Sequence, residues 1–223
     1  MGIPLNHWIS KVKMKLFDST YFLGKPPMPA SFEKLPNVNE NFIFDGMTLN
    51  ETKLLKYISR NQLIQFDIEK ENNVPEILRN LQLRVERLGP ARHGFFGQPC
   101  YQYELNQTAF DAWAQKYKVV LDHVDAFFPE MYSYATDPAE WGKRLDFMLT
   151  NLRRIAGDRP IYPFLWFIHP YRLPAAPVYI GDEFWQYQLN QCRRKADGAV
   201  VCGGYLEQWD ENAPWWRILQ HYI

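Results

Sequence analysis

The chain has little cysteine, no excess of charge of either sign and no long apolar run. Its 223 residues contain three cysteines, and 25 basic residues stand against 25 acidic ones. Cys100, Cys192 and Cys202 form no Cys-x-x-Cys pair, which disfavours both a disulfide framework and a structural zinc site. We therefore expect three reduced thiols. The balanced charge disfavours binding to nucleic acid or to an anionic membrane surface.

Sequence signals for membranes, export and nucleotides are also missing. No stretch reaches the roughly 18 consecutive apolar residues of a membrane span. The start, "MGIPLNHWISKVKMKLFDSTYF", lacks the apolar segment of a signal peptide. A cytoplasmic location is the default expectation, with export by another route left open. No GxGxxG or GxxxxGK[ST] motif follows an apolar run, which disfavours the usual nucleotide-binding open sheets. We expect no cofactor and no metal ion.

Aromatic residues are abundant, at 16% of the chain with eight tryptophans. Most of them are expected in the core, although aromatic faces also suit sugar rings. A chain of this length buries a substantial core without cross-links, and no linker or repeat divides it. We predict one domain over residues 1–223.

Apolar runs and helical patterns alternate along the chain. The apolar runs cover residues 19–24, 41–46, 63–69, 93–99, 124–134, 161–170 and 198–204, and helical spacing covers 49–59, 74–88, 108–122, 138–156, 182–195 and 213–222. Asp137, Pro138 and Glu140 are typical of a helix start, and Gly157 of a helix end. The proline-rich stretch 24–37 is predicted to be a loop. Strand–helix alternation predicts the α/β class, as a distorted (β/α) TIM-like barrel of about seven to eight strands; an open doubly wound sheet is the alternative.

The stretch "LIQFDIE" places two acids at the end of a predicted strand. Alternation puts Asp67 and Glu69 on one face with Leu63 and Gln65, opposite an apolar face. If that face points into a barrel, the two carboxylates lie at its C-terminal mouth. Neighbouring carboxylates disfavour each other's ionisation, which creates a general acid at neutral pH. The alternative is an acidic cluster that opens a solvated loop.

Several motifs, taken in order, resemble the hyaluronidase family of β/α-barrel glycoside hydrolases. They are "FDIE", "HGFFGQPCYQYEL", "FFPEMY" and "ADGAVVC", spread between about residues 61 and 212. The resemblance implies that Glu69 protonates the leaving oxygen and that Asp67 orients the substrate's 2-acetamido group, whose carbonyl attacks the anomeric carbon. It also implies that Tyr132 binds near that acetamido group.

The chain departs from the hyaluronidase pattern at two positions. Phe96 replaces a tyrosine, and Cys202 replaces a tryptophan that would form a wall beside the sugar. Tyr101 or Tyr103 would restore a hydroxyl group, and Trp166 or Trp209 would supply an aromatic platform. We therefore take as candidate substrate-binding residues Tyr132, Phe96, Tyr101, Tyr103, Glu130, Trp166, Cys202 and Trp209.

Three further residues have competing interpretations. Glu130 shares strand parity with Tyr132, so it would tune Glu69, bind a sugar hydroxyl or act as a nucleophile; alternatively it caps the turn around Pro129. His169, at the end of an apolar run, is expected to be a hydrogen-bonded strand-end residue rather than a catalytic base. His93 is expected at the opposite end of its strand from the chemistry.

The sequence thus predicts a retaining glycoside hydrolase that cleaves a 2-acetamido-sugar-containing oligosaccharide or polysaccharide. The alternative is a catalytically silent barrel of the same lineage that binds a glycan or a protein partner, with Phe96 and Cys202 as the cause of its silence. A third interpretation is a glycosidase with its own nucleophile, such as Glu130. The oligomeric state is left open.

Overall fold

A computed structural model gives the structure of the chain. It describes residues 14–20, 22–34, 37–39, 63–67, 75, 92–96, 105–134, 136–169, 178–204 and 207–223, and only the backbone of 34, 37–39, 64–67 and 95–96. The predicted strand at 41–46 and the predicted helix at 49–59 lie outside the described residues. So does the predicted helix at 74–88, except for residue 75, which is helical.

Within the described residues, eight short parallel strands form two four-stranded sheets. The strands are β1 (Leu16–Thr20), β2 (Phe32–Lys34), β3 (Asn37–Asn39), β4 (Ile64–Asp67), β5 (His93–Phe96), β6 (Ala126–Phe128), β7 (Phe164–Trp166) and β8 (Ala199–Gly203). One sheet has the order β2-β1-β8-β7, and the other has the order β3-β4-β5-β6. The parallel pairing confirms the predicted β/α connectivity.

Backbone bridges join the two sheets into one sequence of neighbours. Parallel bridges link Phe127 to Ile161 and Glu130 to Phe164, and so connect β6 to β7. β2 and β3 are separated in the chain by residues 35 and 36 alone, and β8 pairs with β1. The strand order therefore follows that of a β/α barrel. Within the described residues, the step from β2 to β3 is made by the chain rather than by a hydrogen-bonded ladder.

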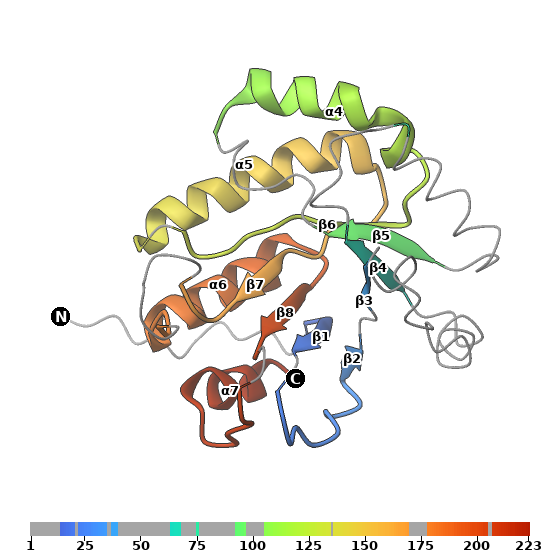
Figure 1. Cartoon of the computed structure of the whole chain (residues 1–223). Coiled ribbons are helices and arrows are strands. Elements are labelled where there is room, and N and C mark those ends of the chain that lie inside the picture. Colours follow the sequence, from blue (N-terminus) through green and yellow to red (C-terminus); the bar gives the residue numbers. More distant parts are fainter. Residues whose placement is uncertain are drawn as a thin grey trace.

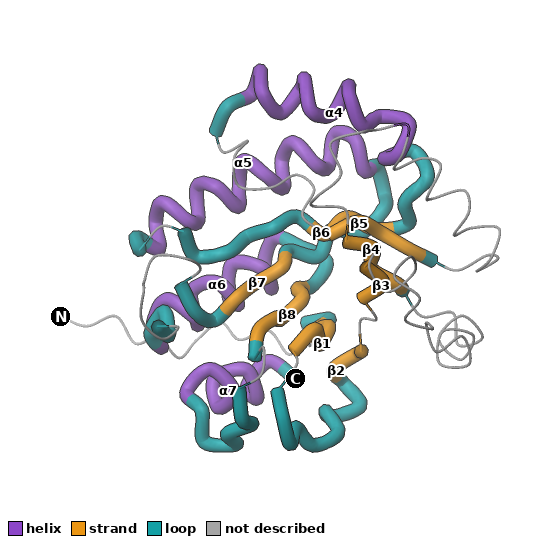
Figure 2. Tube along the Cα trace, in the orientation of Figure 1, coloured by secondary structure: helices purple, strands orange, loops and turns teal. Residues whose placement is uncertain are grey.

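The described helices lie on the outer side of β6, β7 and β8 (Figures 1 and 2). They are α4 (Gln107–Leu121), α5 (Pro138–Ala156), α6 (Asp182–Lys195) and α7 (Pro214–Leu219), the last followed by a 3-10 turn at Gln220–Tyr222. The bounds of α5 and α6 are the predicted ones. Asp137 caps α5 by accepting a hydrogen bond from the Ala139 amide at 2.8 Å, whereas Glu140 pairs with Arg144.

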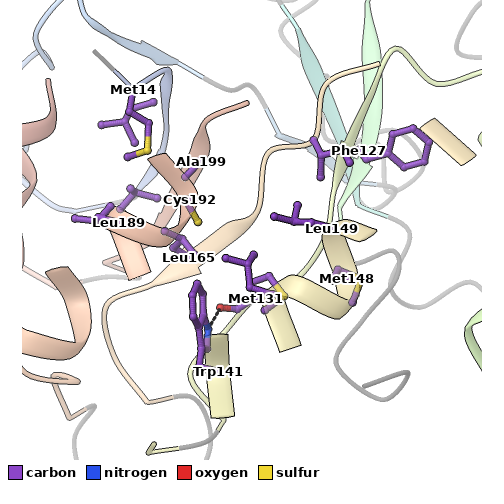
Figure 3. Packing of buried hydrophobic residues seen from close by; sticks show 14 of the residues in the cluster. Met14, Phe127, Met131, Trp141, Met148, Leu149, Leu165, Leu189, Cys192 and Ala199 are labelled. Carbon is purple, nitrogen blue, oxygen red and sulfur yellow. Dashed lines mark hydrogen bonds between the residues drawn. The ribbon is translucent and has the colours of Figure 1, made fainter. Parts of the chain in front are cut away.

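Strand alternation divides the buried residues into two clusters. The outer cluster combines strand residues such as Leu16, Phe127 and Leu165 with residues of all four helices (Figure 3). The inner cluster comes from the strands and their flanking residues: Phe17, Leu63, Ala126, Phe128, Tyr162, Phe164, Val200 and Cys202. An apolar cluster enclosed by strands is the packing expected of a barrel interior.

The N-terminal region differs from its prediction. The first strand is Leu16–Thr20 and not 19–24; β2 lies within the stretch 24–37 that was predicted to be a loop, and β3 begins at the last residue of that stretch. The aromatic run after Thr20 misled the assignment, because Phe22 leaves the sheet and stacks on Trp215. Gly24 then turns the chain with a φ of +71°. The prolines of residues 24–37 favoured a loop in the prediction, so the short strand that begins at Phe32 was not predicted.

Two further expectations concern thiols and metals. Cys192 and Cys202 carry free thiols, and Cys100 lies outside the described residues. The described part of the chain contains no cluster of three or more metal-binding side chains. None of the described helices is long and apolar enough to cross a membrane.

Candidate active site

The inward row of β6 leads to a buried carboxylate. Ala126 and Phe128 belong to the inner cluster, and Tyr132 packs against it. Glu130 pairs with Phe164, an inner-cluster residue, and paired residues of neighbouring strands project from the same face. Glu130 therefore lies on the inner face beyond the C-terminal end of β6, and only 5% of it is exposed.

Tyr134 holds this carboxylate. Its hydroxyl donates a 2.6 Å hydrogen bond to Oε1 of Glu130. A buried carboxylate is costly unless hydrogen bonds replace its water, and a short bond from a phenol meets part of that cost. The result is a fixed acceptor group beside the partly exposed ring of Tyr134.

Tyr132, Trp166 and Cys202 form the neighbouring surface. The rings of Tyr132 and Trp166 lie 5.1 Å apart at an angle of 59°. Cys202, in register with Trp166, has its Sγ 3.4 Å from the Tyr132 hydroxyl and 3.3 Å from the Leu165 carbonyl oxygen. Cys202 is 1% exposed, so it supports Tyr132 from beneath, while the two aromatic rings are partly exposed.

The segment that carries these residues is anchored from its outer side. Trp141 of α5 donates to the Met131 carbonyl oxygen at 3.0 Å (Figure 3). Gln188 of α6 donates to the Ser133 hydroxyl at 2.8 Å, and Nδ1 of His169 lies 3.0 Å from the Ser133 carbonyl oxygen. Met131 and Ser133 thus face outward and are held, while Glu130 and Tyr132 face inward.

Ser133, Tyr134 and Gln188 were not anticipated from the sequence. Continued alternation from Phe128 would have placed Ser133 outward and Tyr134 inward. The helical spacing of α6 would also have shown that Gln188 is buried, since Trp185, Leu189 and Cys192 lie on the same side of that helix.

The other predicted residues are described only in part. Asp67 ends β4, with its backbone in register with Asn39 and Phe96, and Phe96 is in register with Phe128. The side chains of Asp67 and Phe96 lie outside the described residues. Glu69, Tyr101 and Tyr103 lie outside them altogether. Their roles stay predictions.

Trp209 lies at the same end of the strands but packs within an aromatic group. Its ring is 5.6 Å from Phe22, 5.8 Å from Trp215 and 5.2 Å from Trp216. Its amide donates to the Leu23 carbonyl oxygen at 2.9 Å, which ties the segment after β8 to the loop after β1. It is partly exposed, and its role as a sugar platform stays a prediction.

Asp18 of β1 and Lys25 form a buried ion pair. Lys25 Nζ lies 2.5 Å from Oδ2 of Asp18 and donates to the Thr20 hydroxyl at 2.7 Å. Asp18 is in register with Val201, an outer-cluster residue, so it lies on the face opposite the inner row. The pair fixes the loop after β1 rather than contributing to the inner face.

The opposite end of the strands carries structural polar groups. His93 begins β5, and its amide donates to Oδ2 of Asp125 at 2.8 Å, which agrees with its predicted place away from the chemistry. Burial raises the pKa of the Tyr162 hydroxyl, and the charge of Asp197 raises it further. Tyr162 thus stays neutral within the inner cluster.

Comparison with known proteins shows the fold but no family. No known protein family and no curated protein matches the sequence. Three solved structures of glutamate-substituted forms of a GH128 (subgroup I) endo-β-1,3-glucanase from Amycolatopsis mediterranei match 84% of this chain and 78% of their own. Their TM-scores are 0.55, 0.53 and 0.52 at 15%, 15% and 16% identity. The chain therefore shares the fold of these structures. The structure with a TM-score of 0.55 contains laminaripentaose, and the one with 0.53 contains laminarihexaose. The structure with 0.52 contains laminaritriose and laminaribiose.

Proposed function

We propose that this protein is a glycoside hydrolase whose substrate binds at the C-terminal ends of the strands. The observation that carries the proposal is the buried Glu130 carboxylate, held by Tyr134 at that end of a glycosidase fold. Enzymes with β/α barrels place their chemistry there because the loops that follow the strands converge on that face.

The surrounding side chains suit a sugar. Tyr132 and Trp166 offer partly exposed aromatic rings, and Glu130 offers a carboxylate acceptor. Sugar rings combine apolar C–H faces with hydroxyl donors, so they are recognised by this combination of groups. Neither a metal nor a cofactor is required for hydrolysis by carboxyl groups.

The backbone of Asp67, one of the two acids predicted from the sequence, ends β4 at the same end of the sheet. Through Phe96, the backbone of Asp67 is level with Phe128, and Glu130 lies two residues beyond that end of β6. We infer that Asp67 and Glu69 supply the catalytic carboxyl groups, with Glu69 as general acid and base. This assignment rests on the sequence pattern and on the β4 register.

For the substrate, we infer a glycan that contains a 2-acetamido sugar. The support is the hyaluronidase-like order of motifs around Asp67, Glu69 and Tyr132. In that mechanism Asp67 orients the acetamido group, whose carbonyl oxygen attacks the anomeric carbon, so the enzyme supplies no nucleophile.

A β-1,3-glucan is the second candidate substrate, because the structural neighbours are endo-β-1,3-glucanases bound to laminari-oligosaccharides. Such a substrate has no acetamido group, so a second carboxylate must act as nucleophile or activate water. Glu130 is the described carboxylate placed for that role. In a retaining enzyme the two carboxyl groups would be about 5–5.5 Å apart.

The test compares the two substrates. Hyaluronan oligosaccharides and laminarihexaose are given to the wild-type protein, to E69Q and to E130Q, and the anomer first released is followed by NMR. Substrate-assisted hydrolysis predicts cleavage of the acetamido glycan with retention, a loss of roughly 10²-fold or more in E69Q, and a smaller loss in E130Q.

Other results separate the alternatives. Cleavage of laminarihexaose that fails in E130Q, together with trapping of Glu130 by a 2-fluoro glycoside in peptide mass spectra, would establish the enzyme-nucleophile mechanism. Inversion would exclude both retaining mechanisms. Absence of cleavage of any glycan would favour the silent barrel, with Phe96 and Cys202 as the substitutions to revert.

A further inference from the structure

His169 is fixed at the end of β7 by its backbone and by its ring. Its amide donates to the Val178 carbonyl oxygen at 2.9 Å, and Nδ1 lies 3.0 Å from the Ser133 carbonyl oxygen. It follows Trp166 by three residues, so it lies at the same end of the sheet as the candidate site.

The Ser133 contact determines which ring nitrogen of His169 carries the proton. A carbonyl oxygen only accepts hydrogen bonds, so Nδ1 must be the donor. In the neutral imidazole, Nε2 then holds a lone pair. The ring is partly exposed, and Nε2 has no hydrogen-bond partner among the described residues. A fixed acceptor therefore points away from Ser133.

The neighbours of Ser133 are candidate site residues. Ser133 lies between Tyr132 and Tyr134, whose rings are 6.3 Å apart, and Tyr134 binds Glu130. The His169 imidazole is therefore bound to the backbone of a segment that carries a carboxylate and two phenols. A sugar presents several hydroxyl donors on neighbouring carbons, and each needs an acceptor when water is displaced.

We propose that neutral His169 is a glycan-binding residue: Nδ1–H donates to the Ser133 carbonyl oxygen, and Nε2 accepts a hydrogen bond from a sugar hydroxyl. The proposal rests on the proposed function, because it needs a glycan at this end of the strands. His169 acts in binding and transfers no proton.

The first test reads the tautomer and does not depend on activity. The chain has five histidines, so the ring signals of uniformly ¹⁵N-labelled protein at neutral pH are assigned to His169 by their loss in H169N. A protonated Nδ1 and an unprotonated Nε2 are expected. The opposite tautomer, or rapid averaging of the two, would overturn the proposal.

The second test separates binding from catalysis. H169N keeps a side-chain N–H that can reach the Ser133 carbonyl oxygen but lacks the Nε2 acceptor. We expect KM to rise roughly tenfold, the factor for one lost hydrogen bond, while kcat stays within about twofold. H221N, at an exposed site near the C-terminus, is the matched control and should change neither.

The remaining outcomes are decisive as well. An unchanged KM, or a fall in kcat at constant KM, would overturn the binding role. If the wild type cleaves neither hyaluronan hexasaccharide nor laminarihexaose, the proposed function fails, and calorimetry with the same two sugars decides the matter. Binding weakened about tenfold in H169N would support the proposal; equal binding in the variant, or none by the wild type, would overturn it.

Discussion

Arg159 is the residue at which two helix ends meet. Its guanidinium donates to the carbonyl oxygens of Ile155 and Ala156 at the end of α5. It also donates to those of Leu121, the last residue of α4, and Val124. It also lies 4.9 Å from the ring centroid of Phe127. A planar fork with five donors serves several carbonyl groups at once, which an ammonium group cannot do.

We therefore expect R159K to lower the free energy of unfolding by about 2 kcal/mol, since at least two carbonyl groups lose their donor. Urea denaturation followed by tryptophan fluorescence measures this loss. R154K is the control, because Arg154 is exposed and pairs across the surface with Asp111. A loss in R154K as large as that in R159K would show that the carbonyl contacts are not the cause.

Cys192 lies wholly within the outer cluster, at 0% exposure, and burial raises the pKa of its thiol. The thiolate is the reactive form, so native Cys192 should resist iodoacetamide. Moving from about pH 8 to about pH 9 should not accelerate its labelling, because the raised pKa keeps the thiol protonated.

Peptide mass spectrometry of native and guanidinium-unfolded protein checks this prediction for Cys192. The unfolded chain should label fully and faster at the higher pH. Labelling of native Cys192 at the unfolded rate would mean that the helix opens readily or that the thiol is not buried.

At the residue scale, the part of the candidate site that was predicted follows from the alternation of side chains along a strand. The parity of Glu130 and Tyr132 could be read from "FFPEMY", because alternation continues from Ala126 past Pro129. Tyr134 was missed because its partner lies four residues earlier, in a segment where the Tyr134 amide bonds to the Tyr132 carbonyl oxygen instead of a neighbouring strand. The ring contact of His169 joins residues far apart in the sequence, which no local pattern reveals.

At the scale of elements, α5 shows how local chemistry fixes a helix. Asp137 accepts a hydrogen bond from the Ala139 amide, and Pro138 occupies the first turn, where its missing N–H costs nothing. D137A should lower the free energy of unfolding by about 1 kcal/mol, as measured by urea denaturation.

D137N is the control for this prediction, because an amide oxygen caps a helix nearly as well as a carboxylate does. Its loss should be a few tenths of a kcal/mol, from the missing charge near the helix dipole. Equal losses in D137A and D137N would assign the effect to charge rather than to the cap.

Elements with strong local signals were predicted well, and elements that depend on partners were not. The α5 helix has a cap, a regular apolar face and a terminal glycine. β2 and β3 have three residues each and gain their identity by pairing with β1 and β4. Tertiary pairing of that kind overrides the loop signal of prolines.

At the scale of the whole molecule, β1 and the loop after it pack against β8 and the segment after it. β1 pairs with β8 over five residues, and Leu23 forms a bridge with Gln208 beyond them. The ring of Trp215 stacks on Phe167, with ring centroids 4.3 Å apart, and on Phe22, at 5.4 Å. Gly204 permits this closeness, because a Cβ there would lie 2.5 Å from the Phe22 ring.

W215L should therefore release both segments together. We expect hydrogen exchange of the Leu23 and Trp209 amides, which bond across this junction, to accelerate by a similar factor. W113L, in the distant α4, is the control: it should lower global stability and leave the ratio of these two rates to other core amides unchanged. Independent behaviour of the two amides would show that the segments are not one cooperative unit.

For the molecule as a whole, the sequence predicted the arrangement of strands and helices better than it predicted the substrate. Repeated alternation of strands and helices was enough for parallel pairing in barrel order. The choice between an acetamido glycan and a β-1,3-glucan depends on the positions of a few side chains, such as Asp67 and Glu130, relative to one another. Spacing along a strand does not determine a distance across a sheet.

The pairing of β1 with β8 also has a consequence for the nascent chain during translation. A ribosome delivers β1 well before β8, so the edge of β1 that β8 will cover stays unpaired while the residues between the two strands are synthesised. Contacts between segments so far apart in sequence form slowly, and unpaired strand edges invite association with other chains. Production of this protein should therefore depend on temperature and on chaperone supply while it is being synthesised, more than the stability of the finished molecule would indicate.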